Sequence, residues 1–188
     1  MTGSTAHLSG TAPQVRHALQ SDGTFTSVLE TLVGEPVGIT RVSQHDADRT
    51  HYAEELETDA VSRLLVRRVV LAGLNSGIPL AVATTHVVPD RLPARFVDDL
   101  RAGRHPIGRL LLLHRIESLR EPVRLTGEAA AQHAPLLGHE DPHEQLLVRS
   151  YRVVIGAVPA MLIRERVSPT GLRRAGAALT VGEPGGGR

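Results

Sequence analysis

Two very short connections between apolar segments constrain the fold of this chain most. Gly73-Leu74-Asn75-Ser76-Gly77 separates two segments rich in Val, Ile and Leu, and Gly156-Ala157-Val158 separates two more. Neither connection has room for the crossover helix that parallel strands would need, so each predicts a hairpin of two antiparallel strands. The sheet is therefore expected to be mainly antiparallel.

Six segments have the composition of β-strands, and Gly, Pro, Asn or Asp bounds several of them. They cover residues 37–42, 61–72, 78–88, 109–116, 145–155 and 159–167. Four other segments have the character of helices. These are residues 15–20, 25–33, 92–102 and 128–137. Because the helices do not alternate with the strands, we expect an α+β fold, a six-stranded sheet with helices packed on one face.

The length and the termini indicate one domain. With 188 residues the chain can bury a single core without a metal or a disulfide. Residues 1–13 are rich in Thr, Ser, Gly and Ala, and residues 182–188 are rich in Gly, so both ends are poor in apolar side chains. We therefore expect a disordered N-terminus over 1–13, a folded domain over 14–172 and a flexible tail over 173–188.

Composition and charge narrow the function. The chain has no cysteine, no basic and apolar leader and no apolar run long enough to span a membrane, so we expect a cytoplasmic protein with no membrane segment. The net charge is +1 and the basic residues are scattered, which argues against a nucleic-acid partner. All 21 Lys and Arg residues are arginine, so a buried cation other than histidine must be a guanidinium, the group that binds carboxylates bidentately. We expect a monomer or a weak homodimer.

The string His139-Glu140-Asp141-Pro142-His143 matches the His-Glu-x-x-His pattern of zinc proteases, which requires both histidines on one helical face. Pro142 removes a backbone donor and disfavours helix at Asp141, and Gly138 precedes the string. We therefore expect a polar loop rather than a metal site.

Alternation along residues 159–167 singles out Glu165. It shares one face of the predicted strand with Met161, Ile163 and Val167, while its neighbours Arg164 and Arg166 point to the other face. A carboxylate among apolar side chains is costly unless it is paired, and burial raises its pKa, which suits a proton donor or a partner for a ligand hydroxyl. A buried structural ion pair is the alternative interpretation.

Arginines on two other strands are candidates for binding an anion. Arg67 shares a strand face with Leu65, Val69 and Leu71, and Arg68 shares the opposite, equally apolar face, so alternation does not decide which of the two points inward. A buried guanidinium requires a carboxylate from the protein or from a ligand. Arg152 is a further candidate, with a structural role as its alternative.

A turn precedes the apolar residues 109–116. It reads Arg104-His105-Pro106-Ile107-Gly108-Arg109, and Gly108 allows backbone to approach closely. Main-chain amides at such a turn are able to hold an anionic oxygen, and an ordinary tight turn is the alternative.

Taken in order, these segments resemble the chorismate pyruvate-lyase family from about Asp22 to Pro169. The similar segments are Asp22-Gly23-Thr24-Phe25-Thr26, Arg67-Arg68-Val69-Val70-Leu71 followed by Val87-Val88-Pro89, Pro106-Ile107-Gly108-Arg109-Leu110-Leu111, Arg149-Ser150-Tyr151-Arg152, and the last strand with its single Glu165. The departures from the family pattern include Phe25 in place of a methionine and Arg164 in place of a threonine.

The resemblance implies a six-stranded antiparallel sheet and a reaction that needs no metal or cofactor, in which chorismate gives 4-hydroxybenzoate and pyruvate. It implies that Arg67 holds the ring carboxylate with the amides near Ile107 and Gly108, and that Glu165 lies at the ring hydroxyl. Phe25 and Thr26 would contact the substrate, a small aromatic or pre-aromatic carboxylate. Arg152 is expected to meet its second carboxylate.

Two alternatives stay open at this point. The ligand domain of one class of bacterial transcription regulators shares the fold, so the chain is alternatively a non-catalytic domain that binds a small effector. A relative recruited to a biosynthetic pathway would keep the pocket and act on a similar small cyclic carboxylate.

Overall fold

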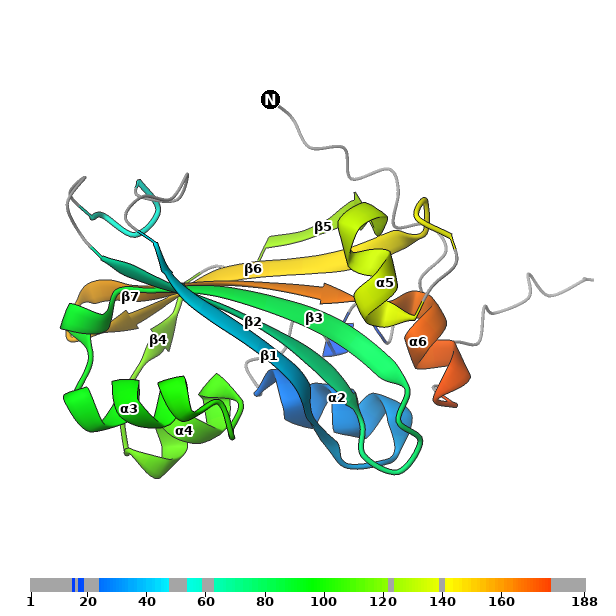
Figure 1. Cartoon of the computed structure of the whole chain (residues 1–188), viewed down its shortest axis with the longest axis horizontal. Coiled ribbons are helices and arrows are strands. Elements are labelled where there is room, and N and C mark those ends of the chain that lie inside the picture. The colour runs from blue at the N-terminus through cyan, green and yellow to red at the C-terminus, as the bar shows by residue number, and fades with distance from the viewer. Residues whose placement is uncertain are drawn as a thin grey trace, which may run out of the picture.

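The computed structural model describes residues 15, 17–18, 24–47, 54–58, 63–121, 124–138 and 141–176. Its centre is a seven-stranded sheet in the order β1-β2-β3-β7-β6-β4, with β5 also paired to β6 and every pair antiparallel (Figure 1). The strands are β1 Val37–Ala47, β2 Leu64–Gly73, β3 Pro79–Val87, β4 Leu119–Arg120, β5 Arg124–Ala129, β6 Gln145–Ile155 and β7 Val158–Val167. The predicted α+β class and antiparallel sheet are confirmed.

Both predicted hairpins are present. The first joins β2 to β3 and the second joins β6 to β7 through Gly156 and Ala157. Gly77 and Gly156 have φ values of 70° and 58°, a left-handed conformation that glycine adopts without the steric cost of a Cβ. β7 lies between β3 and β6, so residues from the middle of the chain and from its C-terminal part meet at the centre of the sheet.

Helices cover both faces of the sheet. α2 Phe25–Val33, α3 Ala94–Ala102 and α4 Ile107–Leu113 pack on the face that carries Leu65, Val69 and Ile163, and the C-terminal α6 Pro169–Arg174 packs at its end. Figure 1 shows α5 Ala134–Leu137 on the opposite side, where it packs with Val70 and Val82. The expectation that helices lie on one face therefore holds for the four helices around the larger core and not for α5.

The expected strand over residues 109–116 is wrong, because this segment forms helix α4. Ile107, Leu110 and Leu111 are buried at helical spacing, while Leu112 and Leu113 are 70% and 58% exposed. A short apolar run does not distinguish strand from helix by composition, and four successive leucines are strong helix formers.

The expected helix over residues 128–137 is also largely wrong. Its beginning belongs to β5, which pairs with β6, and it continues as a 3-10 turn, η3 Ala131–His133, before the single turn of α5. Pairing with the edge of β6 overrides the local preference here. In the expected helix 15–20, residues 15, 17 and 18 are described and are helical.

The predicted termini, 1–13 and most of 173–188, lie outside the described residues. Within the part of the chain that the structure describes, no helix is long and apolar enough to cross a membrane.

Candidate active site

A cavity lies between the sheet and the helices α2 and α4. Antiparallel pairing aligns Val69, Ala83, Glu165 and Arg149 in one row across the sheet, and Arg67, Thr85, Ile163 and Tyr151 in the next. The small side chains of Ala83 and Thr85 occupy the centre of these rows and leave room above the sheet. The cavity contains about 540 Å³ of atom-free space, part of it open to solvent.

Arg67 is the cation at the β2 end of the cavity. It is 2% exposed and lines the cavity, whereas Arg68 is exposed on the other face, so the structure decides the orientation that the sequence left open. One guanidinium nitrogen donates a 3.0 Å hydrogen bond to the carbonyl of His105. Within the described chain, Nε of Arg67 has no hydrogen-bond partner. Burial lowers the pKa of Arg67 to about 10, which leaves it charged at neutral pH.

The first residues of α2 and α4 form the wall opposite the sheet. Phe25, Thr26, Ile107 and Gly108, all expected at the site, line the cavity. A Cβ added to Gly108 would lie 3.2 Å from Cγ2 of Thr24, so the glycine allows the two helix starts to pack closely.

Glu165 lies on β7, the second strand over from Arg67, and is 3% exposed. Tyr151 donates a 2.9 Å hydrogen bond to its Oε1, and Nε of Arg149 lies 3.5 Å from its Oε2. That 3.5 Å contact is an ion pair without hydrogen-bond geometry, so Oε2 is a buried acceptor with no hydrogen bond from the described residues. Burial raises the pKa of Glu165 to about 7, against the charge of Arg149 and the Tyr151 hydrogen bond.

Tyr151 connects the polar groups of the cavity. The guanidinium of Arg149 lies 5.1 Å from the centre of its ring, and that of Arg120 on β4 lies 5.7 Å from it. Burial, followed by the charge of Glu165, raises the pKa of the Tyr151 hydroxyl, which therefore stays protonated and donates to Glu165.

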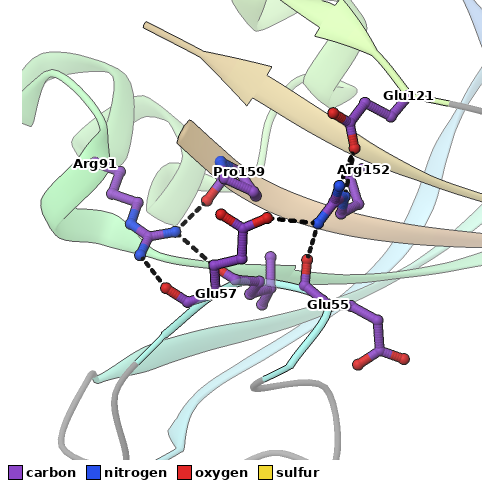
Figure 2. Close-up of polar contacts among 7 residues, drawn as sticks. Glu55, Glu57, Arg91, Glu121, Arg152 and Pro159 are labelled. Carbon is purple, nitrogen blue, oxygen red and sulfur yellow. Dashed lines mark hydrogen bonds and ion pairs between the residues drawn. The ribbon is translucent and has the colours of Figure 1, made fainter. Parts of the chain in front are cut away.

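The structure does not place Arg152 at this cavity. Arg152 lies on the face of the sheet opposite the cavity (Figure 2). Its guanidinium binds the carboxylate of Glu121, just after β4, and on its other side the carboxylate of Glu57 and the carbonyl oxygen of Glu55. Arg91 holds the same 54–57 turn through the carbonyl oxygens of Leu56 and Glu57. The expected second cation of the site is therefore an arginine that fastens this turn to the sheet.

Sequence reasoning missed three residues of the site. Arg149 and Tyr151 share a face of β6 with Leu147 and Val153, so the alternation that identified Glu165 would have placed both of them inward. Arg120 carries no such signal, because β4 is only two residues long.

Of the histidine string, His139 and Glu140 lie outside the described residues. Asp141 accepts a 2.8 Å hydrogen bond from the amide of His143 in the turn before β6. Over the described ranges, no group of three His, Asp or Glu side chains is placed to hold a metal ion.

Comparison with known proteins gives the family of the chain. The sequence pattern of chorismate pyruvate-lyase Rv2949c-like proteins matches residues 19–175. The chain belongs to this family. Curated chorismate pyruvate-lyases are similar to it as well. The protein from Mycobacterium leprae is 29% identical over 80% of this chain and 72% of its own length. The protein from Mycobacterium tuberculosis strain H37Rv is 28% identical over 80% of this chain and 77% of its own.

Solved structures share the fold of this family member. PhnF from Mycobacterium smegmatis superposes with a TM-score of 0.61 at 18% identity over 80% of this chain, which spans 65% of the PhnF chain. The effector domain of PhnF gives a TM-score of 0.58 at 18% identity, covering 79% of this chain and 90% of that domain. At these identities the likeness concerns the fold alone.

Proposed function

We propose that this family member eliminates pyruvate from chorismate and forms 4-hydroxybenzoate. The observation that carries the proposal is a pair of buried polar atoms in one cavity, the donor Nε of Arg67 and the acceptor Oε2 of Glu165, neither with a hydrogen-bond partner in the described chain. Leaving a buried donor or acceptor without a hydrogen bond costs about 1 to 3 kcal/mol. A ligand that complements both carries an acceptor such as a carboxylate at one end and a donor such as a hydroxyl at the other.

The spacing of the two groups suits opposite ends of one ring. Arg67 and Glu165 lie two strands and two residues apart, or about 12 Å between backbones, and both side chains extend into the space between. Arg67 would hold the ring carboxylate. The first amides of a helix have no acceptor within it, so the N–H groups of Ile107 and Gly108 at the start of α4 would complete the carboxylate site.

Glu165 would accept the hydrogen bond of the ring hydroxyl and assist removal of the proton from the carbon that carries it. The electron pair of that C–H bond forms a ring double bond as the ether bond to the enolpyruvyl group breaks, and the ring becomes aromatic. The released enolpyruvate takes up one proton at its methylene carbon and becomes pyruvate. With a pKa of about 7, Glu165 is able to bind and release a proton at neutral pH.

The test is incubation of the purified protein with chorismate. We expect 4-hydroxybenzoate, followed by its ultraviolet absorbance, and pyruvate, followed with lactate dehydrogenase, in equal amounts and well above the rate without protein. Chorismate that binds in calorimetry and is not turned over would contradict the lyase and favour an effector-binding domain. Absence of both binding and turnover would overturn both proposals.

A further inference from the structure

Arg120 is a second cation in the lining of the cavity, and it has no role in the proposal so far. It pairs with Val153 in the register of β4 and β6, and Val153 lies on the cavity face of the sheet. Residues opposite each other in an antiparallel pair point to the same face, so Arg120 points toward the cavity, which it lines. Its side chain is partly buried.

The ring of Tyr151 helps to orient Arg120. The guanidinium lies 5.7 Å from the ring centre, which is within the range of a cation–π contact. Such a contact uses the flat face of the guanidinium, whereas carboxylates bind its N–H edge. The hydroxyl of the same tyrosine holds Glu165, so the cation and the carboxylate are positioned by one side chain.

The charges around the cavity exceed what one ligand carboxylate requires. Arg67 and Arg120 line the cavity and Arg149 lies behind it, while Glu165 is the single acid among the described lining residues. Two guanidinium groups therefore line the cavity together with one carboxylate. A ligand with two carboxylates can present one of them to each lining arginine.

We propose that Arg120 binds the second carboxylate of a ring dicarboxylate, and that this contact separates substrate from product. The inference rests on the proposed lyase function. Chorismate carries one carboxylate on its ring and another on its enolpyruvyl ether, and 4-hydroxybenzoate keeps only the first. Arg67 therefore contacts substrate and product alike, while Arg120 contacts the substrate alone. Loss of the second carboxylate with pyruvate weakens the hold on the product and favours its release.

Arg120 also takes the role that was expected of Arg152, which is to bind the second carboxylate of the substrate. Arg152 lies next to Tyr151 in sequence and, by the alternation of a strand, on the opposite face, where Glu121 and Glu57 bind it. Arg120 reaches the cavity from the neighbouring strand and on the same face as Tyr151.

The test compares Arg120→Gln with Arg67→Gln and with the control Arg68→Gln, whose side chain is exposed on the other face of β2. Calorimetry measures the Kd of 4-hydroxybenzoate, and initial rates measure the KM of chorismate. Losing one charge-assisted contact typically weakens binding about ten- to hundred-fold. We expect this loss for chorismate and less than about a threefold change for 4-hydroxybenzoate in Arg120→Gln. Arg67→Gln should weaken both ligands, and Arg68→Gln neither.

Equal weakening of both ligands in Arg120→Gln, or no change in either, would overturn the role of Arg120 even if the wild-type protein is an active lyase. If the wild-type protein does not turn chorismate over, the Kd of chorismate replaces its KM, so the two proposals fail separately. Arg120→Lys keeps the charge and should recover most of the preference for chorismate. A variant whose melting temperature equals that of the wild type and whose preference is unchanged would also contradict the proposal.

Discussion

The hydroxyl of Tyr151 donates a 2.9 Å hydrogen bond to Oε1 of Glu165, and both side chains are buried beside the cavity. This contact favours the ionised form of a carboxylate that burial would otherwise keep protonated. Together with Arg149 it holds the pKa of Glu165 at about 7, where the group both accepts and releases protons at neutral pH.

Tyr151→Phe should therefore shift the pH dependence of turnover. If turnover needs ionised Glu165, kcat rises with pH around the pKa of that group. Removal of the hydrogen bond raises this pKa further, so the midpoint of the rise moves to higher pH. A hydrogen bond to a charged group contributes about 1.5 to 3 kcal/mol, or about one to two pH units at most. Measurement of kcat from pH 5 to 9 tests the shift. An unchanged midpoint would contradict the claim that the Tyr151 hydrogen bond lowers the pKa of Glu165.

Arg67→Ala should weaken binding of 4-hydroxybenzoate far more than Arg68→Ala does. Arg67 is buried and lines the cavity, while Arg68 is exposed on the opposite face of the same strand. The loss of a bidentate charge-assisted contact costs about 1.5 to 3 kcal/mol, which is about ten- to hundred-fold in Kd. Calorimetric titration measures it. A larger effect from Arg68→Ala would contradict this prediction, because it would mean that Arg68 rather than Arg67 faces the ligand.

The strands of this fold were predictable where both periodicity and turns marked them. The sequence places Arg67 and Glu165 on apolar faces, and two short turns imply that their strands belong to antiparallel hairpins. Helix α4 was mistaken for a strand because its leucine run is compatible with either structure. The expected helix over residues 128–137 begins inside β5, because pairing with β6, a contact between residues separated in the sequence, determines the conformation there.

The site was less predictable than the fold, because its side chains come from different strands and the order of those strands in the sheet brings them together. Alternation identifies inward residues one strand at a time, and it does not state that Arg149 pairs with Glu165 or that β4 brings Arg120 to Tyr151. Arg152 illustrates the limit, since its partners Glu57 and Glu121 come from segments far away in the sequence.

Gly108→Ala should impair the cavity by separating the starts of α2 and α4. The added Cβ would lie 3.2 Å from Cγ2 of Thr24, so one of the two helix starts must move by a few tenths of an ångström. Misplacement of binding groups by distances of this order reduces affinity and turnover. We expect a several-fold rise in the Kd of 4-hydroxybenzoate with little change in melting temperature. The double variant Gly108→Ala with Thr24→Ser removes Cγ2 and should recover part of the affinity, and no recovery would contradict this explanation.

Glu128 should stabilise the protein at neutral pH and lose that effect in acid. His133, whose Nε2 lies 3.6 Å from Oε1 of Glu128, and then Arg166, which donates a 2.9 Å hydrogen bond to the same oxygen, lower the pKa of Glu128 to about 2. Because the folded pKa is below the unfolded value, its contribution is complete above about pH 4.5 and is lost as the pH falls toward 2. Glu128→Gln should therefore lower the melting temperature at pH 7 and differ less from the wild type at pH 3. Thermal melts across this range measure the effect, and an equal difference at both pH values would contradict it.

Glu165→Gln tests the central claim most directly, with chorismate turnover and melting temperature measured on the same preparation. Gln keeps the size of the side chain and an acceptor, but it loses the charge and the transferable proton. A role in proton movement at the ring predicts a cooperative melt near that of the wild type and a fall in kcat of about a hundred-fold or more. A structural ion pair with Arg149 predicts instead a loss of about 3 to 5 kcal/mol of stability. A large fall in melting temperature with near-normal turnover by the folded fraction would contradict the account.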